Sequence, residues 1–283
     1  MIPVRAAIIG LGRMGGPMAD HVVRAGHDVR VFDLSPDAIA ARVAAGATAA
    51  ASPAEAAEGA SVVGVVVFDD AQAVEVVAGA EGVLRTLYPG AVVAIHTTVT
   101  LDTIRALAEA AEQAGVQVLD AGISGGEEGA GAGTLLTMVG GDAAPLDTAR
   151  PVLDAFSKEV LHAGPLGAGM ALKLARNAAG YSMMAVVHES MALAVRAGVD
   201  LDQLRHTITE TGVLRQAMSP FDLGGPDPLP EGESGLRLAM EHLVRLGDKD
   251  LAHSLDLAAR LGVDMPVTET TRRTFPSVCR LDP

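Results

Sequence analysis

The glycine pattern Gly10-x-Gly12-x-x-Gly15 constrains the fold of this 283-residue chain most, because it follows an apolar run and opens a predicted helix. Residues 4–33 therefore have the length and order of one strand–helix–strand unit. Glycines at these three positions allow a tight turn, close approach of a pyrophosphate and close packing of helix on strand. Free amides at the helix start can bind phosphates. The pattern predicts a dinucleotide site, and a glycine turn without a ligand is the alternative.

The second predicted strand ends at Asp33, 18 residues after Gly15. A carboxylate there can accept hydrogen bonds from an adenosine ribose and repels a 2′-phosphate. Leu34 and Ser35 follow, so no arginine is next to it to bind that phosphate. The sequence therefore favours NAD over NADP, unless Asp33 only caps the helix that begins at Pro36.

Short apolar runs alternate with Ala-rich runs in the first half of the chain, which predicts a doubly wound parallel sheet. We expect strands at 4–9, 29–33, 62–68, 91–96 and 116–120, and two more at 134–140 and 159–163. The expected helices between them span 13–25, 36–46, 71–79, 101–115 and 144–156.

Beyond residue 164 the sequence predicts only helices. The first, over 166–197, is apolar on nearly every face, which is typical of a buried helix. Further helices are expected at 201–211, 236–246, 248–261 and 266–279, with a Pro/Gly-rich loop over 219–233. The predicted fold class is α/β, with a Rossmann domain at 1–164 and an all-helical domain at 165–283, joined by the long helix.

Composition excludes several classes of protein. The net charge is −14, which argues against a nucleic-acid partner, since such partners need a basic surface. A single cysteine, Cys279, excludes a disulfide framework and a thiolate metal cluster, and we predict no metal. No uncharged apolar run is long enough to span a membrane, and the N-terminus reads as a strand rather than a signal peptide. We expect a cytoplasmic protein.

The segment from Asp120 to Gly126 follows a predicted strand, where open α/β sheets bind ligands. Ser124 offers a hydroxyl, and Gly125 and Gly126 can present bare N–H groups to a carboxylate. The same stretch matches the hydrolase pattern G-x-S-x-G, which needs a helix directly after the serine. The Gly-rich residues that follow predict a poor helix, so we disfavour a hydrolase; a flexible loop without a ligand is the other alternative.

Lys173 and Asn177 lie four residues apart on the long apolar helix, hence on one face. Only three of the 21 basic residues are lysines, and the others are Lys158 and Lys249. A partly desolvated ammonium has a lowered pKa, which suits a general acid/base. We expect Gly167 and Gly169 to let this helix approach the cofactor, although a lone lysine on a helix is usually a surface residue.

Four ordered blocks together resemble the β-hydroxyacid dehydrogenases. They are Gly10-Leu-Gly-Arg-Met-Gly-Gly-Pro-Met-Ala19, Asp120–Gly126 with Gly133–Gly141, Gly167–Asn177, and Lys249-Asp-Leu-Ala. The resemblance implies that Lys173 is the catalytic acid/base and that Ser124, Gly125, Gly126 and Asn177 hold the substrate. It also implies that Thr98 contacts NAD and that Lys249 meets cofactor or substrate. One departure is Gly122, where the family usually has proline.

The function that we predict is hydride transfer between NAD and a short 3-hydroxy carboxylic acid, or reduction of the matching semialdehyde. An imine reductase and a non-catalytic dinucleotide-binding scaffold are the alternatives. We also expect a homo-oligomer, a dimer or a tetramer, formed through the helical domains. The predicted cofactor contacts are Gly10, Leu11, Gly12, Arg13, Met14, Gly15, Asp33, Phe68, Asp69, Thr98 and Lys249.

Overall fold

The computed structural model describes residues 3–222, 227–232 and 235–281. The chain divides into two compact units, Met1–Asn177 and Ala178–Pro283. This division falls inside helix α8 (Ala168–Arg196), whereas the predicted domain boundary lies just before that helix. In the described part, no helix combines the length and apolar character that crossing a membrane demands.

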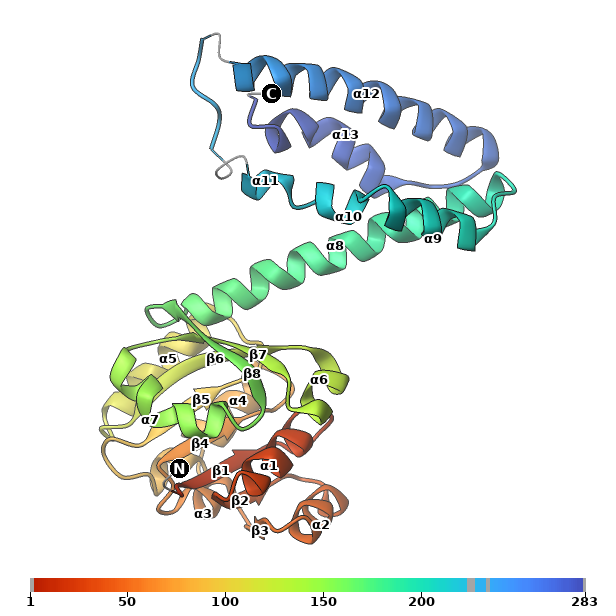
Figure 1. The fold of residues 1–283 in the computed structure, drawn as a ribbon. Coiled ribbons are helices and arrows are strands. Elements are labelled where there is room, and N and C mark those ends of the chain that lie inside the picture. The colour runs from red at the N-terminus through yellow and green to blue at the C-terminus, as the bar shows by residue number, and fades with distance from the viewer. Residues whose placement is uncertain (1–2, 223–226, 233–234, 282–283) are drawn as a thin grey trace. The chain divides into compact units, whose positions relative to one another are not determined.

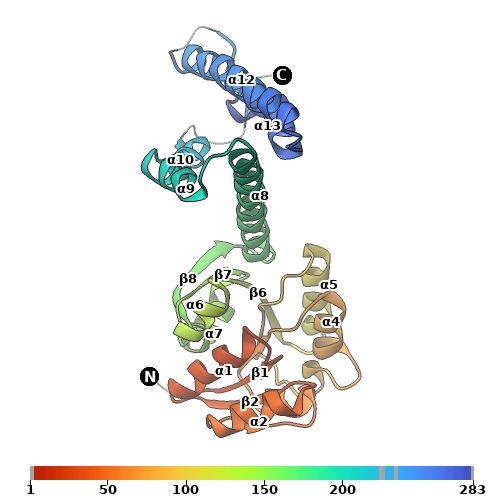
Figure 2. The same cartoon turned by 90° about the vertical axis from the view of Figure 1, so that its right-hand side faces the viewer.

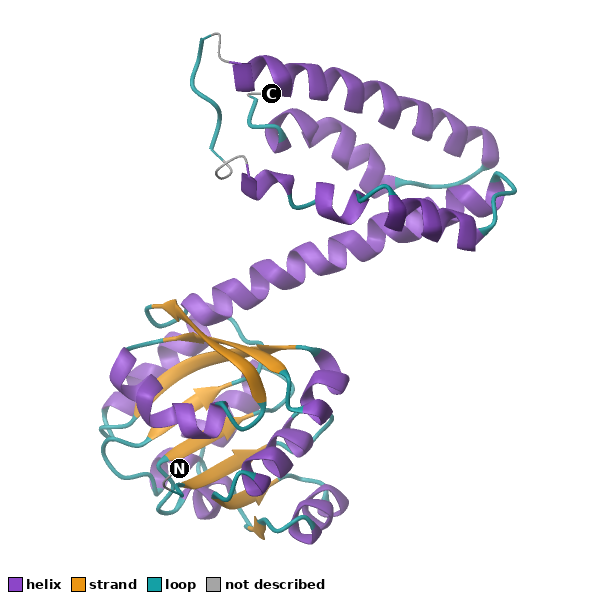
Figure 3. Ribbon diagram, viewed as in Figure 1, coloured by secondary structure: helices purple, strands orange, loops and turns teal. Residues whose placement is uncertain are grey.

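The first unit contains one eight-stranded sheet in the order β3-β2-β1-β4-β5-β6-β7-β8 (Figures 1 and 3). The first six strands in this order are parallel, as expected, while β7 and β8 run antiparallel to them. The strands are β1 (Arg5–Ile9), β2 (Asp28–Phe32), β3 (Thr48–Ala49), β4 (Val62–Val65), β5 (Val92–Ile95), β6 (Gln117–Ser124), β7 (Leu135–Gly140) and β8 (Ser157–Gly164).

Helices cover both faces of this sheet (Figure 2). Successive strand side chains point to opposite faces, so β1 places Ala6 and Ile8 in one core and Ala7 and Ile9 in the other. The helices are α1 (Gly15–Arg24), α2 (Pro36–Ala44), α3 (Pro53–Ala57), α4 (Asp70–Ala78), η1 (Val83–Arg85), α5 (Leu101–Glu112), α6 (Gly126–Ala132) and α7 (Ala143–Leu153). Burial on both faces explains why the strands are apolar throughout.

Strand β4 is shorter and strand β6 longer than predicted. Residues 66–68 leave the sheet, and the Thr97 hydroxyl accepts a hydrogen bond from the Val67 N–H at 2.9 Å. Strand β6 continues to Ser124 because it pairs with the antiparallel β7, an orientation that the apolar pattern did not reveal.

The prediction of a poor helix after Ser124 is wrong. Helix α6 begins directly after Gly125 and ends at Gly133, whose φ of +68° suits glycine. Low helix propensity is overridden by packing, since Ala130 is buried in a core and His21 of α1 bonds the Gly131 carbonyl at 3.0 Å. The helix that the hydrolase pattern G-x-S-x-G requires is therefore present after Ser124.

The second unit is helical, as predicted. It contains the later part of α8, α9 (Leu201–Glu210), α10 (Val213–Gln216), α11 (Ser219–Asp222), α12 (Gly235–Leu261) and α13 (Pro266–Val278). The loop expected over 219–233 begins instead with the helical turn α11, and 223–226 and 233–234 of it lie outside the described residues.

Two helices were predicted on either side of Gly247, and the structure has the single helix α12. The Phe275 ring of α13 occupies the space where a side chain at position 247 would lie. Gly247 is therefore a packing contact between α12 and α13 rather than a helix end. Nearby, Arg272 of α13 pairs with Asp248 of α12 at 2.7 Å.

A buried carboxylate, Glu189, ties α8 to the start of α13. It accepts hydrogen bonds from the Val267 N–H at 2.7 Å, the Thr268 N–H at 3.0 Å and the Thr268 hydroxyl at 2.7 Å. These amides belong to the first turn of α13, where no earlier helical carbonyl can accept from them. The carboxylate thus caps that helix from inside the second unit.

Candidate functional site

The glycine loop between β1 and α1 has the geometry of a phosphate cradle. Gly10 has a φ of +92°, and its N–H donates to the Phe32 carbonyl at 2.9 Å. A Cβ at Gly15 would collide with the Gly10 carbonyl, so this glycine is needed for close packing. Around Gly12, by contrast, a Cβ would meet no atom within 4 Å, which leaves the backbone open to a ligand. The three glycines therefore fit the roles of a dinucleotide-binding turn.

A cavity of about 760 Å³ adjoins this loop. Several predicted cofactor residues line it: Gly10, Gly12, Arg13, Met14, Gly15, Asp33 and Phe68. Two walls carry the exposed apolar side chains Leu34 and Phe68, which are 90% and 85% exposed. Glu75 and Glu81, which sequence analysis did not single out, also line the cavity and make it acidic. The size and lining suit part of a dinucleotide.

Asp33 lies at the end of β2 and holds the glycine loop. Its carboxylate accepts hydrogen bonds from the Leu11 N–H at 2.6 Å and the Ser35 N–H at 2.8 Å. The cap of α2 is Ser35, whose hydroxyl accepts from the Ala38 N–H. The alternative role of Asp33 as cap of the Pro36 helix is therefore wrong, and Leu11 joins the site through its backbone.

The remaining predicted cofactor residues lie outside that cavity lining. Asp69 caps α4, since its carboxylate accepts from the Gln72 N–H at 2.9 Å. Thr98 is exposed just after β5. Lys249 is in the second unit, on α12, and pairs with Asp250 at 3.2 Å. The sequence also allowed Lys249 to lie at an exposed helix start capped by Asp248. That alternative is wrong, because both residues lie inside α12.

The Lys173 side chain lies against strand β6. Its Nζ donates a hydrogen bond to the Ile123 carbonyl oxygen at 2.5 Å, and its Cβ packs beside the Cα of Gly122. The side chain is half-buried, and this burial lowers the pKa of the amine. The positive charge of Arg176 lowers the pKa further.

Ser124 follows the residue whose carbonyl binds this amine, and Asn177 lies four residues after Lys173. Ser124 is the residue after Ile123, at the end of β6, and Gly125 and Gly126 follow with φ of +137° and +63°. Asn177 is half-buried one helical turn beyond Lys173, and its Oδ1 accepts from the Arg176 guanidinium at 3.3 Å. None of these residues lines the 760 Å³ cavity, so the described site has two parts at the same edge of the sheet.

The structure also reveals a residue to which sequence analysis gave no role. Asp120 of β6 is fully buried, and its carboxylate accepts from the N–H groups of Gly167 and Met170 at the start of α8. A charged residue within an apolar strand was the available signal. Gly169 was expected to bring the helix close to the cofactor, but it lies against the backbone of β6 and β7, where a side chain would not fit.

Residues 5–164 match the family described as the NAD binding domain of 6-phosphogluconate dehydrogenase. Residues 167–282 match the family described as NAD-binding of NADP-dependent 3-hydroxyisobutyrate dehydrogenase. The chain is also 36% identical over 270 residues to a 3-hydroxyisobutyrate dehydrogenase from Pseudomonas aeruginosa, covering 95% of this chain and 90% of that relative.

The chain belongs to the β-hydroxyacid dehydrogenase family. The resemblance drawn from the four sequence blocks is therefore confirmed, and so is the fold class. As a member of this family, the protein is an oxidoreductase with a nicotinamide dinucleotide cofactor.

Solved structures agree with this family. The structure of 3-hydroxyisobutyrate dehydrogenase from Mycobacterium tuberculosis with L-serine has a TM-score of 0.70 at 28% identity, covering 99% of this chain and 97% of that chain. An imine reductase from a Pseudomonas species has a TM-score of 0.78 at only 20% identity, covering 99% and 97%. The likeness to the imine reductase shows a shared fold alone.

Proposed function

We propose that this β-hydroxyacid dehydrogenase oxidises the hydroxyl group of a short 3-hydroxy carboxylic acid with NAD and, in reverse, reduces the matching semialdehyde. The observation that carries the proposal is the half-buried Lys173 amine, which bonds the Ile123 carbonyl one residue before Ser124. Its lowered pKa brings proton exchange closer to neutral pH. The similarity to a 3-hydroxyisobutyrate dehydrogenase and to an enzyme solved with L-serine supports the substrate class, since both compounds are 3-hydroxy acids.

The substrate carboxylate is bound by the Ser124 hydroxyl and the N–H groups of Gly125 and Gly126. Gly125 and Gly126 stand at the N-terminus of α6, where N–H groups have no earlier helical carbonyl to bond and can bind an anion. Asn177, one turn after Lys173, holds the reacting oxygen or orients the amine. These contacts place the hydroxyl group beside the base before reaction, which is a large part of enzymatic rate enhancement.

Lys173 moves the proton in both directions. In oxidation its neutral amine takes the hydroxyl proton, and in reduction its ammonium returns a proton to the carbonyl oxygen. When bound, NAD supplies the acceptor for the hydride that leaves the hydroxyl-bearing carbon.

NAD is the preferred cofactor in this proposal. Asp33, Glu75 and Glu81 line the cavity beside the glycine loop, and Arg13 is the only cationic side chain in that lining. Asp33, at the end of β2, repels a 2′-phosphate on the adenosine ribose, and the two glutamates add to the negative charge of the cavity. Thr98 and Lys249 remain predicted contacts of the cofactor or substrate.

The decisive test is a panel of short 3-hydroxy acids, including 3-hydroxyisobutyrate and L-serine, assayed with NAD for each lysine variant. We expect Lys173→Ala to abolish turnover while leaving NAD affinity nearly unchanged. Lys158→Ala, which removes an exposed amine on β8, is the matched control and keeps full activity. Turnover retained by Lys173→Ala would refute the lysine mechanism. Inactivity of the wild type on every acid, with NAD still bound, would favour the imine reductase or scaffold alternatives.

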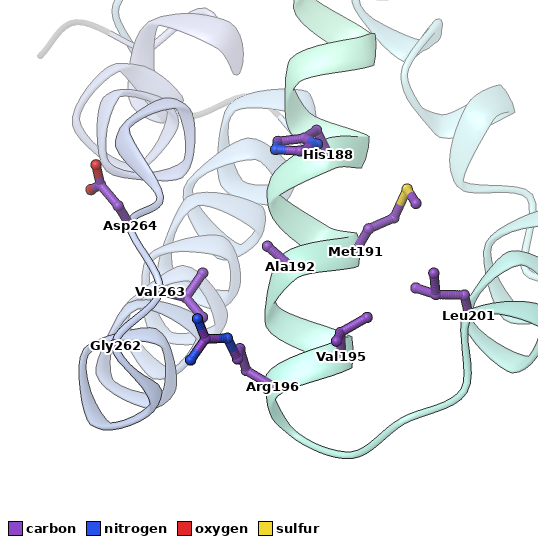
Figure 4. A pocket seen from close by; sticks show the side chains of 9 residues that line it. All are labelled: His188, Met191, Ala192, Val195, Arg196, Leu201, Gly262, Val263 and Asp264. Carbon is purple, nitrogen blue, oxygen red and sulfur yellow. The ribbon is translucent and has the colours of Figure 1, made fainter.

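The protein in this proposal forms a homo-oligomer, in the first instance a dimer. Within the second unit α8 exposes several large apolar side chains: Tyr181, Met183, Met184, Val186, Val187, Met191 and Val195. A hollow of about 390 Å³ lies beside the last of these, between α8, the start of α9 and the α12–α13 connection (Figure 4). Apolar surface of this kind marks a protein interface. Light scattering tests this, and a monomer at micromolar concentration contradicts it.

A cytoplasmic location remains a prediction from the sequence.

A further inference from the structure

The buried carboxylate of Asp120, the first residue of the segment Asp120–Gly126, bonds the start of helix α8. Asp120 is 0% exposed, and its two oxygens accept from the Gly167 N–H at 2.6 Å and the Met170 N–H at 2.5 Å. Gly167 directly precedes α8 and Met170 lies in its first turn, so no earlier helical carbonyl can accept from either N–H group. A buried charge is stable only when it is bonded in this way, and the positive end of the helix dipole adds to the attraction.

The same strand contacts the same helix one turn later. Gly122 lies against the Lys173 side chain so closely that a Cβ at position 122 would be 2.9 Å from the Lys173 Cβ. The next residue, Ile123, then offers its carbonyl to the Lys173 Nζ. Thus β6 holds α8 at its first turn through Asp120 and holds the lysine through Gly122 and Ile123.

We propose that Asp120 is a positioning residue for Lys173: its carboxylate fixes the first turn of α8 and so keeps the lysine amine at the Ile123 carbonyl, with Gly122 as the point of close contact. Two further contacts make this turn rigid. The Met170 side chain is fully buried in a core, and Gly169 packs against backbone of β6 and β7. A shift of the first turn therefore moves Lys173, because the helix between them has no flexible joint.

Other titratable groups near this contact add little charge. His96, the residue after β5, bonds the Ala121 carbonyl at 2.7 Å, but burial lowers its pKa to about 4, so it is neutral at pH 7. Arg176 is the charged group that acts on Lys173. Loss of the Asp120 negative charge would by itself lower the pKa of Lys173. A rise in that pKa after mutation of Asp120 therefore reports a change in the position or burial of the amine.

The test measures the amine directly. The chain has only three lysines, so 15N labelling of lysine yields three Nζ signals, and the signal lost in Lys173→Ala identifies Lys173. In Asp120→Asn the amide offers one acceptor oxygen where the carboxylate offered two, which leaves one helix N–H unpaired. We expect the Lys173 pKa to rise toward the ordinary lysine value and kcat to fall about 100-fold, with NAD affinity nearly unchanged.

Glu189→Gln is the matched control. Glu189 also lies on α8, and its buried carboxylate also caps a helix, so the substitution weakens the same kind of hydrogen bonding at another place. It lowers stability but leaves the Lys173 pKa and kcat at wild-type values. If Asp120→Asn leaves both values unchanged, or if Glu189→Gln shifts them equally, the inference is overturned. Should Asp120→Asn fail to fold, Gly122→Ala displaces the lysine at the contact itself, and an unchanged pKa and kcat there overturn it as well.

This inference rests on the proposed function, but the two fail differently. The proposed function fails if Lys173→Ala keeps turnover. The positioning role fails if the Nζ titration of Lys173 does not respond to Asp120→Asn or to Gly122→Ala, whatever the activity.

Discussion

Removal of the Glu189 side chain is expected to destabilise the helical unit strongly. Its carboxylate accepts three hydrogen bonds, from the N–H groups of Val267 and Thr268 and from the Thr268 hydroxyl. Hydrogen bonds to a charged group contribute about 1.5–3 kcal/mol each, and a buried donor left without a partner costs about 1–3 kcal/mol. These contributions overlap, so Glu189→Ala should lower the free energy of unfolding by about 3–5 kcal/mol.

Glu189→Gln keeps one acceptor oxygen, so a loss of about 2 kcal/mol is expected. Urea unfolding followed by circular dichroism gives the total, and amide hydrogen exchange of α13 locates the effect, since the two units need not unfold together. Glu210→Gln changes an exposed carboxylate of α9 and should alter stability by less than about 0.5 kcal/mol. A loss below about 1 kcal/mol in Glu189→Ala, or unchanged exchange in α13, would refute the capping argument.

Three further outcomes are expected. The rate of alcohol oxidation should rise with pH through a Lys173 pKa that lies below the ordinary lysine value, because burial favours the neutral amine that oxidation requires. The rate of aldehyde reduction should fall over the same pH range, because reduction requires the ammonium. Parallel pH profiles in the two directions contradict this. Fluorescence titration should show tighter binding of NADH than of NADPH, and the reverse order removes the role of Asp33. Gly247→Val should cost about 1–3 kcal/mol by displacing the Phe275 ring, whereas Gly235→Ala, at an open site, should cost nothing in the same denaturation assay.

Features that depend on neighbouring residues in the chain were predictable from the sequence. The glycine turn, the strand before it and the helix after it need only local spacing, so residues 4–33 formed the expected unit. The same holds for Lys173 and Asn177, because a spacing of four places both on one face of any helix. Family membership followed from four such local blocks.

Features that depend on contacts distant in sequence were not predictable. Helix α6 forms despite its glycines because α1 and the core pack against it, and α12 continues through Gly247 because α13 fills the missing side-chain volume. Propensity describes a residue among its neighbours, whereas these residues respond to packing partners far along the chain.

The site divides in the same way. Sequence alone made Lys173 a candidate acid/base, through its apolar helix, the scarcity of lysine in the chain and the family resemblance. Only the tertiary structure placed that amine on the Ile123 carbonyl and the Asp120 carboxylate at the start of α8. The bonded residues in these two contacts are 50 and 47 residues apart in the chain. Burial and hydrogen-bond partners set the pKa and position of a charged group, and both arise when the strand and the helix pack together.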